Sequence, residues 1–440
     1  MMSNKENSIY NIKKIARNMS SYNDVKSKVE SRENSYSIDG IEVSCWDDIA
    51  LSRGIPGICI LFAELDNLFP DEGWSEYTYS YFKKIIEILQ TDGMRSASLF
   101  SGAAGIGISA FCNSKNGCAY QNFISNINDI IMKAVSMILS FDISEGVTST
   151  FYDVIEGLSG ILGYLYLFSD NLQISEIIRK CIRKLIELTE QREYSGTKIP
   201  NWYIPKRYQF TEHERKIYPQ GNFNTSLSHG TAGILLALAG GIKYGIEESG
   251  QIDAIKRIID FYKKYFVLDE ENHVFWHGQI SWEEYKAGRI NNENSFRRDA
   301  WCYGNPGIDY ALYVAATVIE DTYTQEFAIK NLCETVKNIH GIYSPTFCHG
   351  YAGILGILLA LENNYNVNIL QQEKAEIVKK IENYYDSRYE FGYWDIEQER
   401  GAYVNYKKVG LLDGCVGTCL TLLEYYCGAT TSWNNAFLLI

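Results

Sequence analysis

One short pattern occurs seven times along the chain: a Gly-x-x-Gly turn that is followed directly by a strongly apolar stretch. A turn that recurs ahead of apolar segments is typical of repeat proteins, in which each unit buries its apolar face against its neighbours. The seven turns begin at Gly54, Gly102, Gly157, Gly230, Gly304, Gly350 and Gly414. If the units are built alike, the residues just before each turn occupy equivalent places in space.

The segments after and between the turns have the periodicity of helices. Residues 233–241 and 353–361, which follow two of the turns, are apolar on every side, as in helices that are covered all round. Other segments repeat apolar residues at intervals of three and four, which predicts amphipathic helices with one wet face. These apolar sets are Phe82, Ile85, Ile86 and Leu89; Ile174, Ile177, Ile178, Cys181, Ile182 and Leu185; and Ile255, Ile258, Ile259, Tyr262 and Phe266. The sequence therefore predicts an all-α protein in which buried inner helices are ringed by outer helices.

Two long inserts interrupt the repeat. Residues 191–226 contain three of the seven prolines and many aromatic residues, which predicts loops or short strands, and residues 267–297 are also poorly helical. Inserts on one side of a repeat array often build a binding face. We expect residues 1–40 to form a polar N-terminal segment and residues 41–440 to form one domain that carries both inserts.

Composition and charge narrow the functional class. The chain has 440 residues, 46% of them hydrophobic, and a formal net charge of −13, whereas a nucleic-acid surface requires clustered Lys and Arg. Residues 1–40 lack the apolar core of a secretory signal, and no apolar run approaches the length of about twenty residues that a membrane span needs. The chain has eleven cysteines and no export signal, and the cysteines of such chains are typically reduced thiols. We therefore expect a cytoplasmic protein that neither binds nucleic acid nor spans a membrane.

Three successive turns carry Cys or His directly before their first glycine. Cys302 precedes the fifth turn by two residues, and Cys348 and His349 precede the sixth. Two thiolates and one imidazole suit zinc and leave a fourth position open, as in catalytic zinc sites. The spacing of these three residues along the chain is not that of a zinc finger. We therefore expect them to come together only if neighbouring repeat units place their turns side by side. The alternative is that the cysteines are small core residues and His349 is a satisfied core histidine.

His229 occupies the equivalent position before the fourth turn. An imidazole at this place could be a fourth metal ligand, or a general acid or base that acts beside the metal near neutral pH. A core histidine without a function is the alternative.

The residues around the fifth and sixth turns resemble a known family pattern. Arg298-Asp299-Ala300-Trp301-Cys302-Tyr303-Gly304, with Cys348-His349-Gly350, His229-Gly230 and the seven glycine turns, is similar to the LanC family of lanthionine synthetase cyclases. Phe296-Arg297 stands where this family frequently has Ser. The resemblance extends from about residue 54 to residue 417. It implies an α/α toroid of seven inner and seven outer helices around one zinc ion, which is bound at the positions of Cys302, Cys348 and His349.

The resemblance also implies catalytic roles for four residues: Asp153, His229, Arg298 and Tyr303. Without it, Asp153 would be read as a helix cap or a solvated acid, Arg298 as an ion-pair partner of Asp299 or of another acid, and Tyr303 as a packing residue. In the implied mechanism, Arg298 stabilises an enolate and His229 transfers a proton with the help of Asp153.

The implied reaction is the addition of Cys thiols of a dehydrated precursor peptide to dehydroalanine or dehydrobutyrine, which gives thioether rings. The substrate would carry a leader, and the partners would be a dehydratase and an exporter, with association at the inner face of the membrane through such a complex. Two alternatives remain: a LanC-like enzyme that adds glutathione to dehydroamino acids, and a non-catalytic zinc-containing scaffold that binds peptide. A prenyltransferase or glycosidase of toroid fold is a further class, but it would need an Asp-rich or paired-carboxylate site, which is not evident here.

Overall fold

The computed structural model describes residues 3–291 and 297–440 of the chain. The chain divides into two compact units, and each is described by itself. The first unit comprises Met1–Ser96, Phe100–Asp129 and Ile342–Leu439, and the second comprises Ala97–Leu99, Ile130–Gly341 and Ile440. Phe296 and its neighbours in the second insert lie outside the described residues.

Every Gly-x-x-Gly turn caps the N-terminus of a helix, as the sequence predicts. The seven helices are almost completely buried, which explains why they are apolar on every side. They are α3 (Ile55–Leu68), α5 (Ala103–Cys112), α7 (Leu158–Leu165), α10 (Thr231–Lys243), α13 (Asn305–Val318), α15 (Tyr351–Tyr365) and α17 (Cys415–Cys427). We call these seven the inner helices.

The second glycine of the third and fifth turns is explained by a close backbone approach. At Gly160 a Cβ atom would lie 2.0 Å from the carbonyl oxygen of Val154, and at Gly307 it would lie 2.2 Å from that of Trp301. In both turns the carbonyl belongs to the residue six positions earlier, so the chain folds back onto the first turn of its own inner helix. Only glycine leaves room for this contact.

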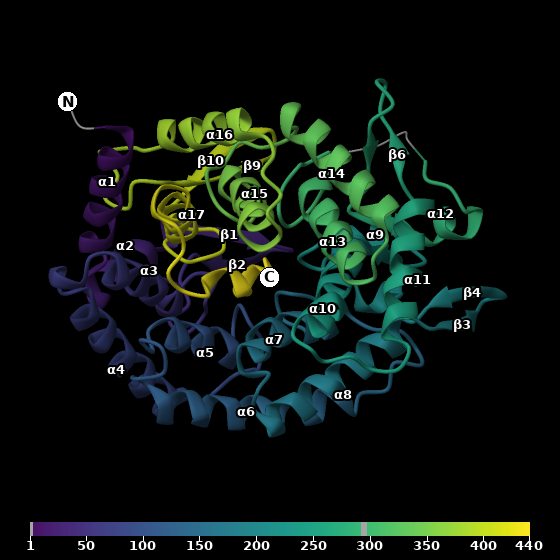
Figure 1. The fold of residues 1–440 in the computed structure, drawn as a ribbon, viewed down its shortest axis with the longest axis horizontal. Coiled ribbons are helices and arrows are strands. Elements are labelled where there is room, and N and C mark those ends of the chain that lie inside the picture. Colours follow the sequence, from purple (N-terminus) through teal and green to yellow (C-terminus); the bar gives the residue numbers. More distant parts are fainter. Residues whose placement is uncertain (1–2, 292–296) are drawn as a thin grey trace. The chain divides into compact units, whose positions relative to one another are not determined.

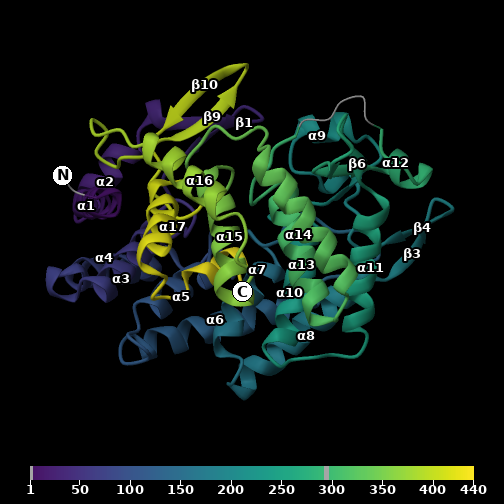
Figure 2. The ribbon, with the colours of Figure 1, turned by 45° about the horizontal axis from the view of Figure 1, so that its top comes forward.

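In the first unit, contacts between inner helices follow the order α15, α17, α3, α5. Outer helices cover them: α4 (Trp74–Asp92) packs against α3, α16 (Gln371–Asn383) packs against α15, and α1 (Asn4–Asn18) packs against both α17 and α3. Residues 1–40 thus contain a helix with a buried face, followed by α2 (Tyr22–Val29). Two hairpins complete the unit, β1 (Ser35–Ile38) with β2 (Ile41–Ser44) and β9 (Asp395–Glu399) with β10 (Ala402–Tyr406), the latter visible in Figure 2.

In the second unit, the inner helices follow the order α7, α10, α13. The outer helix α8 (Leu172–Thr189) packs against α7 and α10, α11 (Gln251–Lys264) packs against α10 and α8, and α14 (Thr322–Lys337) packs along α13 (Figure 1). The predicted apolar face of α8 is buried in full. On α11 the prediction is wrong for Phe266, because the helix ends at Lys264 and Phe266 is exposed. Helix α6 (Gln121–Leu139) contributes residues to both units.

The two inserts form short strands and helices of the second unit. The first insert contains β3 (Gln191–Tyr194), β4 (Thr197–Pro200), α9 (Glu212–Ile217) and β5 (Asn222–Asn224). The second contains β6 (Val267–Leu268), β7 (Val274–Phe275), β8 (Gln279–Ser281) and α12 (Trp282–Ala287). Strand β5 pairs with β8 in an antiparallel ladder, so the two inserts form one structure. Over the described part of the chain, no helix has both the length and the apolar character needed to cross a bilayer.

A methyl group at Gly304 is expected to destabilise the protein. Gly304 has a φ of +101°, and its Cβ would lie 1.8 Å from the carbonyl oxygen of Arg298. Gly304→Ala should therefore lower the free energy of unfolding by about 2–4 kcal/mol, measured by urea denaturation. Gly245 has a φ of +74° but open space around it, so Gly245→Ala is the control and should cost about 1 kcal/mol. Equal losses at both positions would contradict the close contact.

Candidate functional site

Hydrogen bonds between neighbouring turns bring the residues ahead of the inner helices together. In the second unit, the backbone N–H of Val154 donates to the carbonyl of Ser228 at 3.0 Å, and the N–H of Ser228 donates to the carbonyl of Cys302 at 3.2 Å. In the first unit, the N–H of Cys348 donates to the carbonyl of Leu412 at 3.0 Å. Equivalent positions of successive repeats are therefore adjacent within each unit.

Asp153 and His229 form a hydrogen-bonded pair in the second unit. The Oδ2 atom of Asp153 lies 2.7 Å from Nδ1 of His229, and the aspartate is fully buried. The other carboxylate oxygen accepts from the backbone N–H groups of Glu156 and Gly157 at 2.7 and 2.9 Å, which fixes the carboxylate in its own turn. A carboxylate accepts hydrogen bonds, so Nδ1 of His229 carries a proton and Nε2 is left to exchange one. The His229 side chain is 27% exposed and is therefore accessible to a substrate.

The environment of His229 favours the imidazolium. Burial alone would lower the pKa of His229, but the hydrogen bond with Asp153 and the negative charges of Asp153, Cys302 and Glu156 outweigh it, so that the pKa is raised. The ring of Phe210 contacts the imidazole edge-on at a centroid distance of 5.2 Å. The pair therefore has the arrangement of an oriented general acid or base.

Tyr303 lies beside this pair, with its ring centroid 6.4 Å from that of His229. Its hydroxyl accepts a hydrogen bond from Nδ2 of Asn224 on β5 at 3.1 Å, and its ring packs against Gly278, where a Cβ would lie 2.6 Å away. Burial raises the pKa of Tyr303, so the phenol stays protonated near neutral pH. Tyr303 therefore lies in contact range of His229 as a neutral hydroxyl.

Asp299, which the sequence suggests as an ion-pair partner of Arg298, forms an ion pair with the neighbouring Arg297. The buried Asp299 carboxylate binds Nε of Arg297 at 3.2 Å, and it also accepts from the backbone N–H of His340 at 2.8 Å. Arg298 is partly buried, and its carbonyl lies over Gly304. The catalytic role expected for Arg298 stays a prediction.

In the first unit, Cys348 and His349 lie at the turn before α15. Donor atoms of Cys348, His349 and Asp413 all lie within 4.8 Å of one another. Asp413 belongs to the turn before α17 and holds the same position in its repeat as His349 does, a signal that was present in the sequence. Thiolate, imidazole and carboxylate are all zinc ligands, so this donor set fits the metal that the sequence implies. The third predicted ligand, Cys302, is buried at the turn before α13 in the second unit.

The other side of the His349 ring faces the β9–β10 hairpin. Nε2 of His349 lies 2.9 Å from Oδ1 of Asp395 and 3.3 Å from Oε1 of Glu397. Lys408 follows β10, and its Nζ atom lies 2.6 Å from Oδ2 of Asp395. Burial alone would lower the pKa of His349, but the charges of Asp395, Glu397 and Asp413 raise it to about 9. Sequence reasoning missed Asp395, Glu397 and Lys408, which no repeat position marks.

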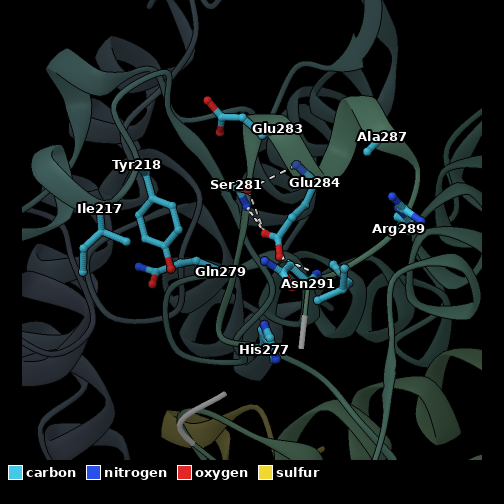
Figure 3. A pocket seen from close by; sticks show the side chains of 11 residues that line it. Ile217, Tyr218, His277, Gln279, Ser281, Glu283, Glu284, Ala287, Arg289 and Asn291 are labelled. Carbon is cyan, nitrogen blue, oxygen red and sulfur yellow. Dashed lines mark hydrogen bonds between the residues drawn. The ribbon is translucent and has the colours of Figure 1, made fainter. Parts of the chain in front are cut away.

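The inserts also line an open cavity of about 1110 Å³ in the second unit (Figure 3). Its lining includes Tyr218, His277, Gln279 and Ser281, and Glu284 lies at its centre in the view, where its carboxylate accepts from Ser281. Residues 277, 279 and 281 alternate with Gly278, which contacts Tyr303. Gly278 lies at a bend directly before β8, between the cavity-lining residues His277 and Gln279.

Comparisons with known proteins agree over nearly the whole chain. Residues 45–438 match the family described as Lanthionine synthetase C-like protein. The Nisin biosynthesis protein NisC of Lactococcus lactis subsp. lactis is 32% identical over 394 residues, which are 89% of this chain and 89% of that protein. A solved structure of a nisin cyclase is similar with a TM-score of 0.79 and 30% identity, over 89% of this chain and 92% of that chain. The resemblance seen in the glycine turns and the mostly helical fold are thereby confirmed.

Proposed function

The chain belongs to the lanthionine synthetase C-like family, and from this we propose that it is a zinc-dependent cyclase that forms lanthionine and methyllanthionine rings in a precursor peptide. The substrate would be a peptide that contains Cys together with dehydroalanine or dehydrobutyrine. The hydrogen-bonded pair of Asp153 and His229 is the observation that carries the proposal.

The reaction needs a group that donates a proton to the α-carbon of the dehydroamino acid. The peptide sulfur forms a bond to the β-carbon of the dehydroamino acid, the π electrons of the C=C bond move towards the carbonyl oxygen, and the resulting enolate takes a proton at the α-carbon. His229 supplies this proton from Nε2, while Asp153 stabilises the imidazolium at Nδ1. Arg298 and the neutral phenol of Tyr303 stabilise the charge on the enolate oxygen. The thiol loses one proton and the α-carbon gains one, so the mass of the peptide is unchanged.

Zinc is the cofactor that we propose, one ion per chain, with Cys302, Cys348 and His349 as its ligands. When bound, zinc lowers the pKa of a thiol and maintains it as a nucleophilic thiolate at neutral pH. The proximity of Cys348 and His349 supports two of the three ligands. Asp413 is an alternative third ligand, because its carboxylate lies in the same group as these two residues.

We further propose that the seven inner helices close into one ring, an α/α toroid over residues 41–440. The regular order of inner helices within each unit supports this arrangement. The relative's name places it in nisin biosynthesis, and for this chain we propose a biosynthetic pathway in which a dehydratase supplies the substrate and an exporter removes the product. The proposed place of action is the cytoplasm, within a complex at the inner face of the membrane.

A direct test uses the purified full-length chain and a dehydrated peptide that contains free Cys. We expect a zinc-dependent loss of free thiols with no change in peptide mass, measured by thiol alkylation and mass spectrometry. Chelation of the metal should stop the loss. Glutathione added to the same reaction distinguishes the two enzymatic functions, because its addition to the peptide increases the mass. Persistence of all thiols in the presence of zinc would contradict both and leave a binding scaffold.

A further inference from the structure

Asp395 contacts the His349 ring at Nε2, the nitrogen on the side away from Asp413. This Nε2 atom lies 2.9 Å from Oδ1 of Asp395, and the side chains of His349 and Asp395 are 6% and 0% exposed. On the other side of the ring, Nδ1 lies 4.0 Å from Oδ1 of Asp413. Since a carboxylate only accepts hydrogen bonds, Asp395 fixes the proton of His349 on Nε2 and leaves the lone pair of Nδ1 for a metal.

Besides its contact with His349, Asp395 is held in place by three side chains. Its Oδ1 atom accepts from the hydroxyls of Ser344 and Thr346 at 3.3 and 3.5 Å, and its Oδ2 atom lies 2.6 Å from Nζ of Lys408. Ser344 also accepts a hydrogen bond from the backbone N–H of Ile396 at 3.2 Å. Ser344 and Thr346 belong to the segment that leads into Cys348 and His349. The hairpin and the Cys-His turn are therefore joined through this carboxylate.

The positive charge of Lys408 compensates for the burial of the negatively charged Asp395 carboxylate. The Lys408 side chain is 7% exposed, and an unpaired charge at such a place would be strongly unfavourable. Asp395 lies between this ammonium group and the His349 ring, so its charge is balanced on one side and directed to the imidazole on the other. Glu397 also approaches Nε2, at 3.3 Å, but its side chain is 29% exposed and solvent screens its charge.

We propose that Asp395, supported by Lys408, is a positioning residue that orients His349 and makes Nδ1 its metal-binding atom. The inference rests on the zinc site proposed above. Carboxylates that hydrogen-bond to the second ring nitrogen of a metal-binding histidine fix its tautomer and orientation, and their removal commonly weakens metal binding by about 10–100-fold.

The test measures zinc affinity of the metal-stripped, full-length protein by competition with a chromophoric chelator. Asp395→Asn should weaken zinc binding by about 10–100-fold. Because this change leaves the buried Lys408 ammonium with only the Asp413 carboxylate, 3.7 Å away, the double variant Asp395→Asn/Lys408→Met removes that ammonium charge as well and should show the same loss. Glu397→Gln is the matched control, since it changes the other carboxylate near Nε2, and it should alter the affinity less than about threefold.

Two further readouts separate positioning from folding. The melting temperature of each metal-free variant reports structural damage, and the visible spectrum of the cobalt-substituted protein reports the geometry of the ligands. We expect the double variant to melt near the wild type and to have an altered cobalt spectrum. Wild-type zinc affinity and an unchanged spectrum in the double variant would overturn the role of Asp395 and leave the zinc site intact. Absence of zinc binding in the wild type would overturn the zinc site, and this inference with it.

Discussion

Cys348→Ala is expected to abolish both zinc retention and ring closure. Cys348 is the thiol closest in sequence to His349, and its donor atom lies in the same group as the imidazole. Its backbone N–H bonds to the carbonyl of Leu412, a contact that alanine keeps, so the turn should remain folded. Loss of a thiolate ligand should reduce cyclisation by at least about 10³-fold, since the substrate thiol then lacks its activating charge. Metal content by mass spectrometry and the free-thiol assay measure the two effects.

The control for this prediction is Cys118→Ala, which removes an exposed thiol distant in sequence from every turn. It should retain stoichiometric zinc and wild-type activity. Cys302→Ala and Asp413→Asn, measured in parallel, identify the third ligand, because only the variant that lacks a ligand should lose the metal. Full zinc content in Cys348→Ala would remove Cys348 from the ligand set and the main support for a metal at this turn.

The sequence predicts the inner helices and their turns because both depend on local chemistry. A capping glycine, a second glycine that accepts the close carbonyl and an all-round apolar segment all lie within one stretch of chain. Gly157, Gly160 and α7 illustrate this, since Val154 supplies the carbonyl that touches Gly160. The pair of Asp153 and His229 follows only in part from the repeat, because neighbouring turns meet but Asp153 lies four residues before Gly157 and His229 one residue before Gly230.

Long-range contacts outside the repeat could not be predicted in this way. Asp395 and Lys408 reach His349 from a hairpin between α16 and α17, and nothing in their local sequence indicates a buried ion pair. Helix α1 packs against α17, from the opposite end of the chain. From the sequence, either of the two arginines that precede Asp299 could form an ion pair with its carboxylate. The packing of the folded chain shows that Arg297 does so.

His229→Ala is expected to lower the rate of ring closure by about 10²–10⁴-fold while zinc binding is retained. The reason is that His229 supplies the proton to the α-carbon in the proposed reaction, and an imidazole held by Asp153 is poised to do so. Single-turnover rates on the dehydrated peptide measure the loss, and metal content shows that the site is intact. His213→Ala, which removes an exposed histidine on α9, is the control and should react at the wild-type rate.

The pH dependence tests whether Asp153 acts through His229. A general acid works in its protonated form, so the rate falls as the pH rises through the pKa of His229. The charge of Asp153 raises that pKa against the effect of burial. Asp153→Asn should therefore move the alkaline limb of the pH–rate profile to lower pH, and His229→Ala should eliminate this limb. If the alkaline limb lies at the same pH in the wild type and in Asp153→Asn, the limb belongs to a group other than His229. Asp153 would then serve only to stabilise the turn before α7.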